Sequence, residues 1–239
     1  ALFSARRNAT EEAIQIHRQA TQRGIQSPYL NWGVGLALLG QGNVAEARQE
    51  FQRLEQAGGI YRSLGQLYLA GTNIYEGKFK VATEQLNDGI ALDQRIGNKG
   101  YELFRRYLLG RTLLMLGKGD LARRQAELIL VAGEPALRAG NIGQAGSLYA
   151  RIGDIAAARQ VLGRLEGLSG SSPTSFNKCC YFNLAGEIKL AEGRPQQAIE
   201  SFLAAAGEYP QFGSHRGMAR AYATQHNWSH AAAEWQQVL

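Results

Sequence analysis

The hydrophobic and polar positions along the chain repeat with the spacing of an α-helix. Apolar residues recur at intervals of three and four, and runs of β-branched residues, which would favour strands, are missing. Small and large apolar residues alternate along the stripes, as in Ala198, Phe202 and Ala205. This pattern predicts an all-α protein whose helices approach closely at small residues and interlock at large ones.

A turn signal recurs in front of these stripes. Gly or His is followed by a polar or basic residue, then by an apolar residue or Pro, and usually by Ala. Gly at this point ends a helix by adopting a positive φ, so each turn is predicted to separate two helices. Periods of this length indicate a repeat architecture. The predicted turn residues are Gly42, Gly77, Gly119, Gly153, Gly193 and His226, at spacings of 35, 42, 34, 40 and 33 residues.

The turns divide the chain into six helix pairs preceded by half a pair. Small residues recur near the middle of several first helices, where a Gly costs about 1 kcal/mol relative to Ala, so we expect close packing there. The third unit departs from the pattern, because Arg124 stands where the others have Ala. The predicted single solenoid covers residues 1–239, with a half repeat at 1–24 and repeats at 28–57, 60–95, 100–133, 136–167, 174–210 and 212–239. The predicted first helices are 28–39, 61–75, 101–116, 136–150, 174–190 and 212–224, after a helix at 10–21.

Composition narrows the class of protein. The net charge is +6, which raises nucleic acid as a partner, but the basic residues are scattered rather than clustered into a phosphate track. The two cysteines are adjacent, at 179 and 180, and are expected to be buried thiols rather than a disulfide. The longest uncharged stretch, 24–45, contains polar residues and glycines, so no membrane span is expected.

The chain opens without Met and in the middle of the repeat pattern. We therefore expect a piece of a longer protein, whose compartment, cytoplasmic or extracytoplasmic, the sequence leaves open. The segment 167–174, GLSGSSPT, is the best candidate for a linker, because it is rich in Gly and Ser.

These features together resemble the tetratricopeptide repeat family, whose units are helix–turn–helix pairs of 34 residues. The resemblance implies a right-handed superhelix of antiparallel helix pairs whose first helices line a concave groove. A single pair cannot bury its apolar face alone, so stacking of neighbours is also expected on physical grounds. The longer spacings resemble extended variants in bacterial regulatory and signalling proteins. The match lies at Phe182, Ala185, Gly186, Ala198, Phe202, Ala205 and Pro210, at Gly35, Ala47 and Phe51, at Ala145, Gly146, Tyr149, Ala158 and Leu162, and at Tyr222, Trp228, Ala231 and Trp235.

No catalytic signature is evident, and we expect neither an enzyme nor a bound cofactor. The glycines at 33–40 lie inside a predicted helix, and LGKGD at 116–120 lacks the spacing of a phosphate-binding loop. His226, His230 and Glu234 share one side of a predicted helix, but a zinc site would need a Glu directly after the first His and a further ligand. No metal is therefore expected.

The resemblance implies which positions of the first helices face a ligand. They are found by counting residues back from each predicted turn residue. Trp32 could anchor a ligand or cover the edge of its repeat. The arginines at 151, 216 and 220, with Asn183, could bind acidic side chains or a C-terminal carboxylate through paired N–H donors. Solvated arginines are the alternative, since the Lys/Asn set of the family's carboxylate-binding members is not reproduced. The predicted groove positions are Tyr29, Trp32, Leu36, Arg106, Leu109, Ser147, Arg151, Asn183, Glu187, Arg216 and Arg220.

The sequence thus favours a non-catalytic scaffold that binds a peptide or helix of another protein, or associates with itself through the ends of the solenoid. A nucleic-acid-binding solenoid is the alternative; it is disfavoured because aromatic stacking platforms interleaved with Arg are not evident. A further alternative is the sensory or regulatory region of an enzyme whose catalytic domain lies outside this sequence.

Overall fold

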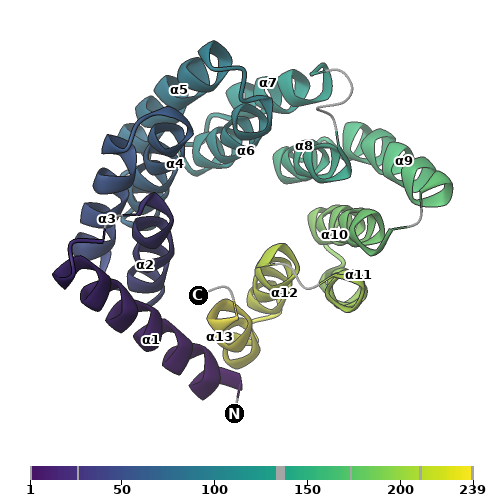
Figure 1. Cartoon of the computed structure of the whole chain (residues 1–239). Helices are drawn as coiled ribbons and strands as arrows, with labels where there is room; N and C mark the ends of the chain where they lie inside the picture. The colour runs from purple at the N-terminus through teal and green to yellow at the C-terminus, as the bar shows by residue number, and fades with distance from the viewer. Residues whose placement is uncertain (1, 26, 133–137, 173, 210–211, 238–239) are drawn as a thin grey trace. The chain divides into compact units, whose positions relative to one another are not determined.

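The computed structural model describes residues 2–25, 27–132, 138–172, 174–209 and 212–237. Within them the regular elements are thirteen α-helices and no strands (Figure 1), which confirms the predicted all-α class. The helices are α1 (Leu2–Gln22), α2 (Pro28–Gly40), α3 (Val44–Gln56), α4 (Gly59–Tyr75), α5 (Phe79–Arg95), α6 (Lys99–Met115), α7 (Gly119–Leu130), α8 (Ala139–Ile152), α9 (Ile155–Ser171), α10 (Ser175–Ala191), α11 (Pro195–Glu208), α12 (Phe212–Thr224) and α13 (Trp228–Gln236).

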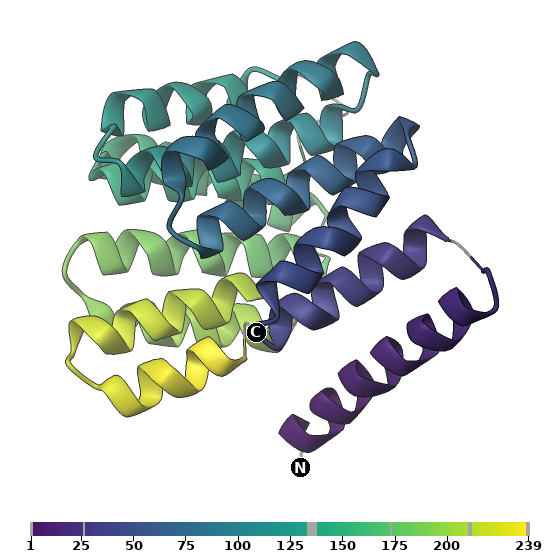
Figure 2. The same cartoon turned by 90° about the vertical axis from the view of Figure 1, so that its left-hand side faces the viewer.

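The chain divides into two compact units, Ala1–Arg105 and Arg106–Leu239, and the division falls within the sequence of α6. In each unit, consecutive helices pack as antiparallel pairs, for example α4 with α5 and α10 with α11 (Figure 2). The first helices of neighbouring pairs also touch, α8 with α10 and α10 with α12. The prediction that residues 1–239 form one continuous solenoid stays a prediction.

Five of the six predicted turn residues have the expected backbone conformation. Gly42, Gly77, Gly153 and Gly193 have φ between 73° and 90°, and His226, at φ 57°, is the only non-glycine with positive φ among the described residues. The prediction of Gly119 was wrong. The left-handed residue is Gly117, at φ 70°, and α7 already begins at 119.

This two-residue shift restores the pattern of the third repeat. Ala122 stands five residues after Gly117, and every other turn residue also has an Ala five residues later. Arg124 is therefore not a departure, contrary to the sequence interpretation. Because Ala has no side chain beyond Cβ, the neighbouring helix can approach the backbone at this position. These buried alanines are Ala47, Ala82, Ala122, Ala158, Ala198 and Ala231.

Glycines on the first helices lie directly against large side chains of the second helices. A Cβ atom built on Gly186 would lie 2.6 Å from the ring of Phe202, which is 1% exposed. Gly217 on α12 contacts the same ring, and Gly35 contacts Phe51 in the same way. The small positions predicted on the first helices thus serve close helix packing.

The predicted linker is mostly helical. Helix α9 continues to Ser171, and the Ser171 hydroxyl donates a hydrogen bond to the Gly167 carbonyl at 2.9 Å. Gly lowers helix stability by about 1 kcal/mol but does not prevent a helix from forming. A prediction from Gly and Ser content therefore placed the linker where the helix still continues. Helix α1 is likewise longer than the predicted 10–21. Predictions that fall on residues 133–137, 173 and 210–211, including Pro210, lie outside the described residues.

The adjacent cysteines are both free and buried. Burial raises the pKa of the Cys179 thiol to about 11 and that of Cys180 to about 12. Both are therefore protonated at neutral pH and are poor nucleophiles. Among the described helices, none combines the length and apolar character needed to cross a membrane.

We expect Gly186→Ala to destabilise the fold by about 1–3 kcal/mol, because the added methyl group overlaps a buried ring that is already packed on both sides. The control is Gly163→Ala in α9, where the space around the missing Cβ is open and the residue is exposed. That change should stabilise by up to about 1 kcal/mol. Urea unfolding compares the two. If the two substitutions changed the free energy of unfolding equally and in the same direction, the glycine–ring contact would not limit packing.

Candidate functional site

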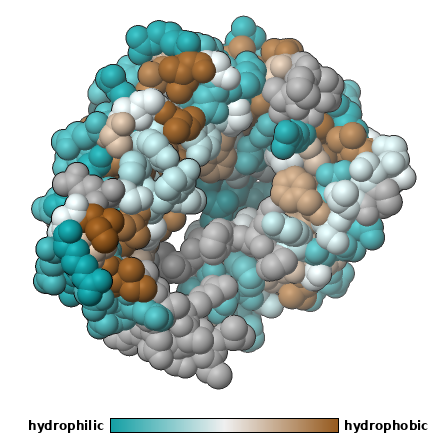
Figure 3. Space-filling view, in the orientation of Figure 1, coloured by the Kyte–Doolittle hydropathy of each residue, from teal (hydrophilic) through white to brown (hydrophobic). Residues whose placement is uncertain are grey.

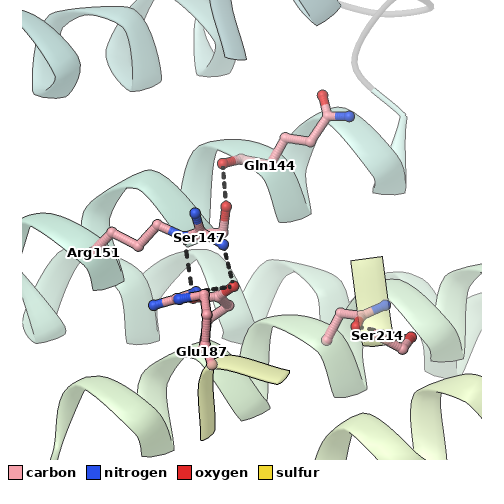
Figure 4. A network of polar contacts seen from close by, with 7 residues as sticks. Gln144, Ser147, Arg151, Glu187 and Ser214 are labelled. Carbon is pink, nitrogen blue, oxygen red and sulfur yellow. Dashed lines mark hydrogen bonds and ion pairs between the residues drawn. The ribbon is translucent and has the colours of Figure 1, made fainter. Parts of the chain in front are cut away.

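Three consecutive first helices of the second unit bring charged side chains together. Arg151 is on α8, Glu187 on α10 and Arg220 on α12, and α10 packs between the other two. Figure 4 shows Arg151 and Glu187 pointing toward one another. The three residues were predicted as groove positions, and the packing of the helices places them in direct contact.

The Glu187 carboxylate accepts four hydrogen bonds. Arg151 donates from Nη2 to Oε1 at 2.6 Å and from Nε to Oε2 at 3.2 Å. Arg220 donates from Nη1 to Oε1 at 2.9 Å and to Oε2 at 2.8 Å. Each oxygen thus accepts two bonds, which fills the acceptor capacity of a carboxylate.

Burial and charge act in opposite directions on this group. The Glu187 side chain is 8% exposed. Burial raises its pKa, but the charges and hydrogen bonds of Arg151 and Arg220 outweigh burial and lower the pKa to about 2. Burial likewise lowers the pKa of Arg151, yet Glu187 and Tyr107 raise it above the ordinary value. The pair is therefore ionised throughout the physiological pH range.

Helix α6 adds an aromatic ring and another arginine. The Arg111 guanidinium lies 5.7 Å from the centre of the Tyr107 ring, which is buried. Burial raises the pKa of Tyr107, but Arg111, Arg151 and Arg216 outweigh it and lower the pKa to about 8. Burial, aided by Arg216 and Arg151, lowers the pKa of Arg111 to about 10. These shifts indicate a local excess of positive charge.

The sequence interpretation missed Tyr107 and Arg111 because of the wrong turn residue. They lie ten and six residues before Gly117, as Asn183 and Glu187 do before Gly193. Counting from position 119 selected Arg106 and Leu109 instead. Arg106 donates a hydrogen bond to Gln125 on α7 at 3.4 Å, and Leu109 is buried at 2% exposure.

The other predicted positions of the second unit make local contacts. Asn183 accepts a hydrogen bond from Ser214 at 3.1 Å and donates one to the Cys179 sulfur at 3.3 Å. The Ser147 hydroxyl donates to the Gln144 carbonyl, one turn earlier on α8 (Figure 4).

Tyr29, Trp32 and Leu36 lie in the first unit. Tyr29 is 65% exposed and meets Tyr61 edge to face at 5.5 Å between ring centres. Trp32 is half-buried against Tyr68, at 6.4 Å between centres. The predicted site residues are thus divided between the two units, and the ion-paired group belongs to the second.

A pocket of about 640 Å³ lies beside the ion pairs in the second unit. It is lined by Arg151 and Arg220 and by aliphatic residues that include Ile152 and Leu190. The pocket therefore offers an apolar surface next to guanidinium groups.

The first unit also contains a charged group, but it is fully enclosed. Arg105 Nε donates to Asp93 Oδ2 at 2.7 Å, and both side chains are 0% exposed. Ser63 donates to the other Asp93 oxygen at 2.5 Å, and Gly89 lies against the guanidinium. A pair without solvent access holds the helices in register and has no surface for a ligand.

The His226, His230 and Glu234 side chains have separate partners. Glu234 lies 2.7 Å from His215, and His230 contacts Asn227 at 2.9 Å. The His226 ring packs edge to face on Trp228. Within the described residues, no three potential metal ligands gather at one place.

No protein-family model matches the chain. No curated protein matches it either. Several solved structures, however, share its fold over most of its length.

A tetratricopeptide repeat protein from Parabacteroides merdae has a TM-score of 0.56 at 14% identity, covering 97% of this chain and 92% of that one. The chain has a tetratricopeptide-repeat fold. The APC/C hetero-tetramer Cut9–Hcn1 gives a TM-score of 0.53 at 14% identity, over 99% of this chain and 44% of that one. BtubC (BKLC) from P. vanneervenii gives 0.51 at 14% identity, over 82% and 87%.

In this tetratricopeptide-repeat fold, the charged group lies on α6, α8, α10 and α12, the first helices of the last four pairs. At these identities the likeness concerns the fold alone, so the roles of the charged residues rest on their own geometry.

We expect Glu187→Gln to lower stability by on the order of 3 kcal/mol at neutral pH, because the folded state holds the Glu187 pKa near 2 against an ordinary 4.5. A depressed pKa stabilises the fold above pH 4.5, and this stabilisation is lost as the pH falls through 2. Urea unfolding should therefore show the difference in free energy of unfolding between the variant and the natural protein shrinking as the pH is lowered from 4.5 to 2. The control is Glu200→Gln at an exposed position on α11. Its free energy of unfolding should differ little from that of the natural protein at any pH.

Tyr107 should ionise near pH 8, well before an ordinary tyrosine, because three arginines stabilise its phenolate. The ultraviolet absorbance of tyrosinate, taken as the difference between the natural protein and Tyr107→Phe, measures this step. Replacing Arg216 with Gln should move the step to higher pH. A step at the ordinary value near 10 would show that the arginines do not act on this ring.

Proposed function

We propose that this chain is a non-catalytic protein-interaction module that binds a peptide or helical segment of another protein through the first helices of its second unit. The observation that supports this most is the group of four arginines around one glutamate on α6, α8, α10 and α12. We call this group, Arg111, Arg151, Glu187, Arg216 and Arg220, the arginine cluster.

The cluster is suited to an acidic ligand. Within the cluster, four guanidinium groups accompany one carboxylate, so positive charge exceeds negative charge. Guanidinium groups bind carboxylates and other oxyanions through two parallel N–H donors, which gives both affinity and orientation. The adjoining pocket, lined by Ile152 and Leu190, suits an apolar side chain next to the acidic one.

Charge is a better guide to the binding surface than hydrophobicity. On the face that Figure 3 shows, hydrophobic residues form separate patches among hydrophilic ones. A negatively charged ligand would be attracted to the arginine cluster before it makes contact, because electrostatic attraction acts over a longer range than apolar contact.

The fold agrees with a binding role. One of the similar structures is the hetero-tetramer Cut9–Hcn1, so a similar helix-pair architecture takes part in a protein assembly there. Two further proposals come from the sequence: that this chain is the repeat region of a larger, bacterial-type regulatory or signalling protein, and that its ends support self-association. Light scattering at increasing concentration tests the second.

The experiment is a display screen of random peptides on the intact chain, followed by fluorescence anisotropy of the enriched sequences. We expect peptides that pair an acidic residue with an apolar one. The double change Arg111→Gln with Arg216→Gln should weaken their binding about tenfold or more, since each charge-assisted hydrogen bond contributes roughly 1.5–3 kcal/mol.

The matched control is Arg138→Gln with Arg164→Gln, which removes the same charge from exposed positions outside the cluster. It should leave binding unchanged. Enrichment of no peptide at all would contradict the proposed function, and equal losses in both double variants would show that net charge, not the cluster, governs binding.

A further inference from the structure

The arginine cluster contains more positive charge than Glu187 can neutralise. The two Glu187 oxygens already accept four hydrogen bonds, all from Arg151 and Arg220. A carboxylate has about four acceptor positions, so none is left for a third arginine. Arg111 and Arg216 therefore make no hydrogen bond to this carboxylate.

Both remaining arginines lack a hydrogen-bonded counter-charge within the described part of the chain. The Nε atom of Arg111 is buried and has no hydrogen-bond partner there. Arg216 is half-buried on α12, four residues before Arg220 and so on the same side of that helix. Its charge and that of Arg111 oppose each other. Guanidinium groups that are taken out of water without an anion are unfavourable, so the geometry favours binding of an external anion.

We propose that Arg111 and Arg216 form a binding site for a phosphate group carried on a peptide, that is, a phosphorylated serine or threonine side chain. This proposal rests on the proposed function and names the chemistry of its ligand. A phosphorylated side chain carries a charge of about −1.5 to −2 and three acceptor oxygens.

The charge decides between phosphate and carboxylate. Four guanidinium groups and one carboxylate leave a net charge of +3 in the cluster, and a phosphate dianion offsets more of it than a carboxylate does. Glu187 contributes by holding Arg151 and Arg220, so these two bind the protein's own carboxylate and flank the site.

The same observations favour a phosphorylated peptide over a nucleic acid. One dianion neutralises Arg111 and Arg216, whereas a nucleic-acid backbone requires a row of basic residues and aromatic rings on which bases stack. The pocket beside the cluster is lined by aliphatic residues such as Ile152 and Leu190 rather than by aromatic ones.

The first experiment uses inorganic phosphate and the intact chain. Isothermal titration should detect one phosphate per chain, with chloride at equal ionic strength as the control anion. Bound phosphate should also shift the ionisation of Tyr107 to higher pH, because a nearby dianion opposes formation of the phenolate. The heat of phosphate binding and the phosphate-induced shift of Tyr107 should both vanish in the double variant Arg111→Gln with Arg216→Gln. Both should persist in the control, Arg138→Gln with Arg164→Gln.

The second experiment compares three peptide pools with a fixed phosphoserine, serine or glutamate at the centre of otherwise random positions. We expect the phosphoserine pool to bind about tenfold more tightly than the serine pool, and the glutamate pool to lie between them. In the Arg111→Gln with Arg216→Gln variant the three pools should bind alike. If that double variant does not fold, as judged by circular dichroism, the single change Arg216→Gln replaces it.

Three results would overturn the proposal. Equal binding of the phosphoserine and serine pools would leave the proposed function intact and reject phosphate as the ligand. An advantage of phosphoserine that survives in the cluster variant would place the site elsewhere. A single-stranded RNA that binds more tightly than the phosphoserine pool would replace the peptide with a nucleic acid. Failure of all peptide pools would reject the proposed function, while the phosphate titration would still decide whether Arg111 and Arg216 bind an anion.

Discussion

The close approach of each first helix to the second helix beside it is the constraint on which the rest of this structure depends. Phe202 fills the space left by the missing side chains of Gly186 and Gly217, and Ala198 lets the helix backbones come near. A larger residue at any of these positions would push the helices apart. Because a helix pair has little core of its own, its stability rests on such contacts with its neighbours.

Close packing also determines where the polar side chains meet. Glu187 lies one position after Gly186 on α10, so the packing contact fixes the height and direction of its carboxylate. Arg151 and Arg220 reach the carboxylate from the helices on either side, at distances of 2.6 to 3.2 Å. An ion pair that is this buried needs accurate geometry to offset desolvation, and the glycine–aromatic contacts provide it.

The two units use buried charge in different ways. In the first, one arginine, Arg105, pairs with one carboxylate, Asp93, with Ser63 bonded to both, and the group is fully enclosed. In the second, Glu187 accepts hydrogen bonds only from Arg151 and Arg220, and one carboxylate cannot balance four arginines. In the first unit the positive and negative charges are equal in number, and the pair supports the fold. In the second unit arginines outnumber the single glutamate, which supports a role in binding.

The sequence by itself determined the helices, the turns and the small packing positions, because helical period and glycine conformation are local properties. It left Gly117 and Gly119 as rivals for the third turn; the backbone shows that Gly117 has the positive φ, and Ala122, five residues later, was the sequence signal for it. Because the positions on α6 were counted from Gly119, Tyr107 and Arg111 were not selected. The saturation of Glu187 could not be predicted either, because it depends on side chains from three helices whose packing only the tertiary structure brings together.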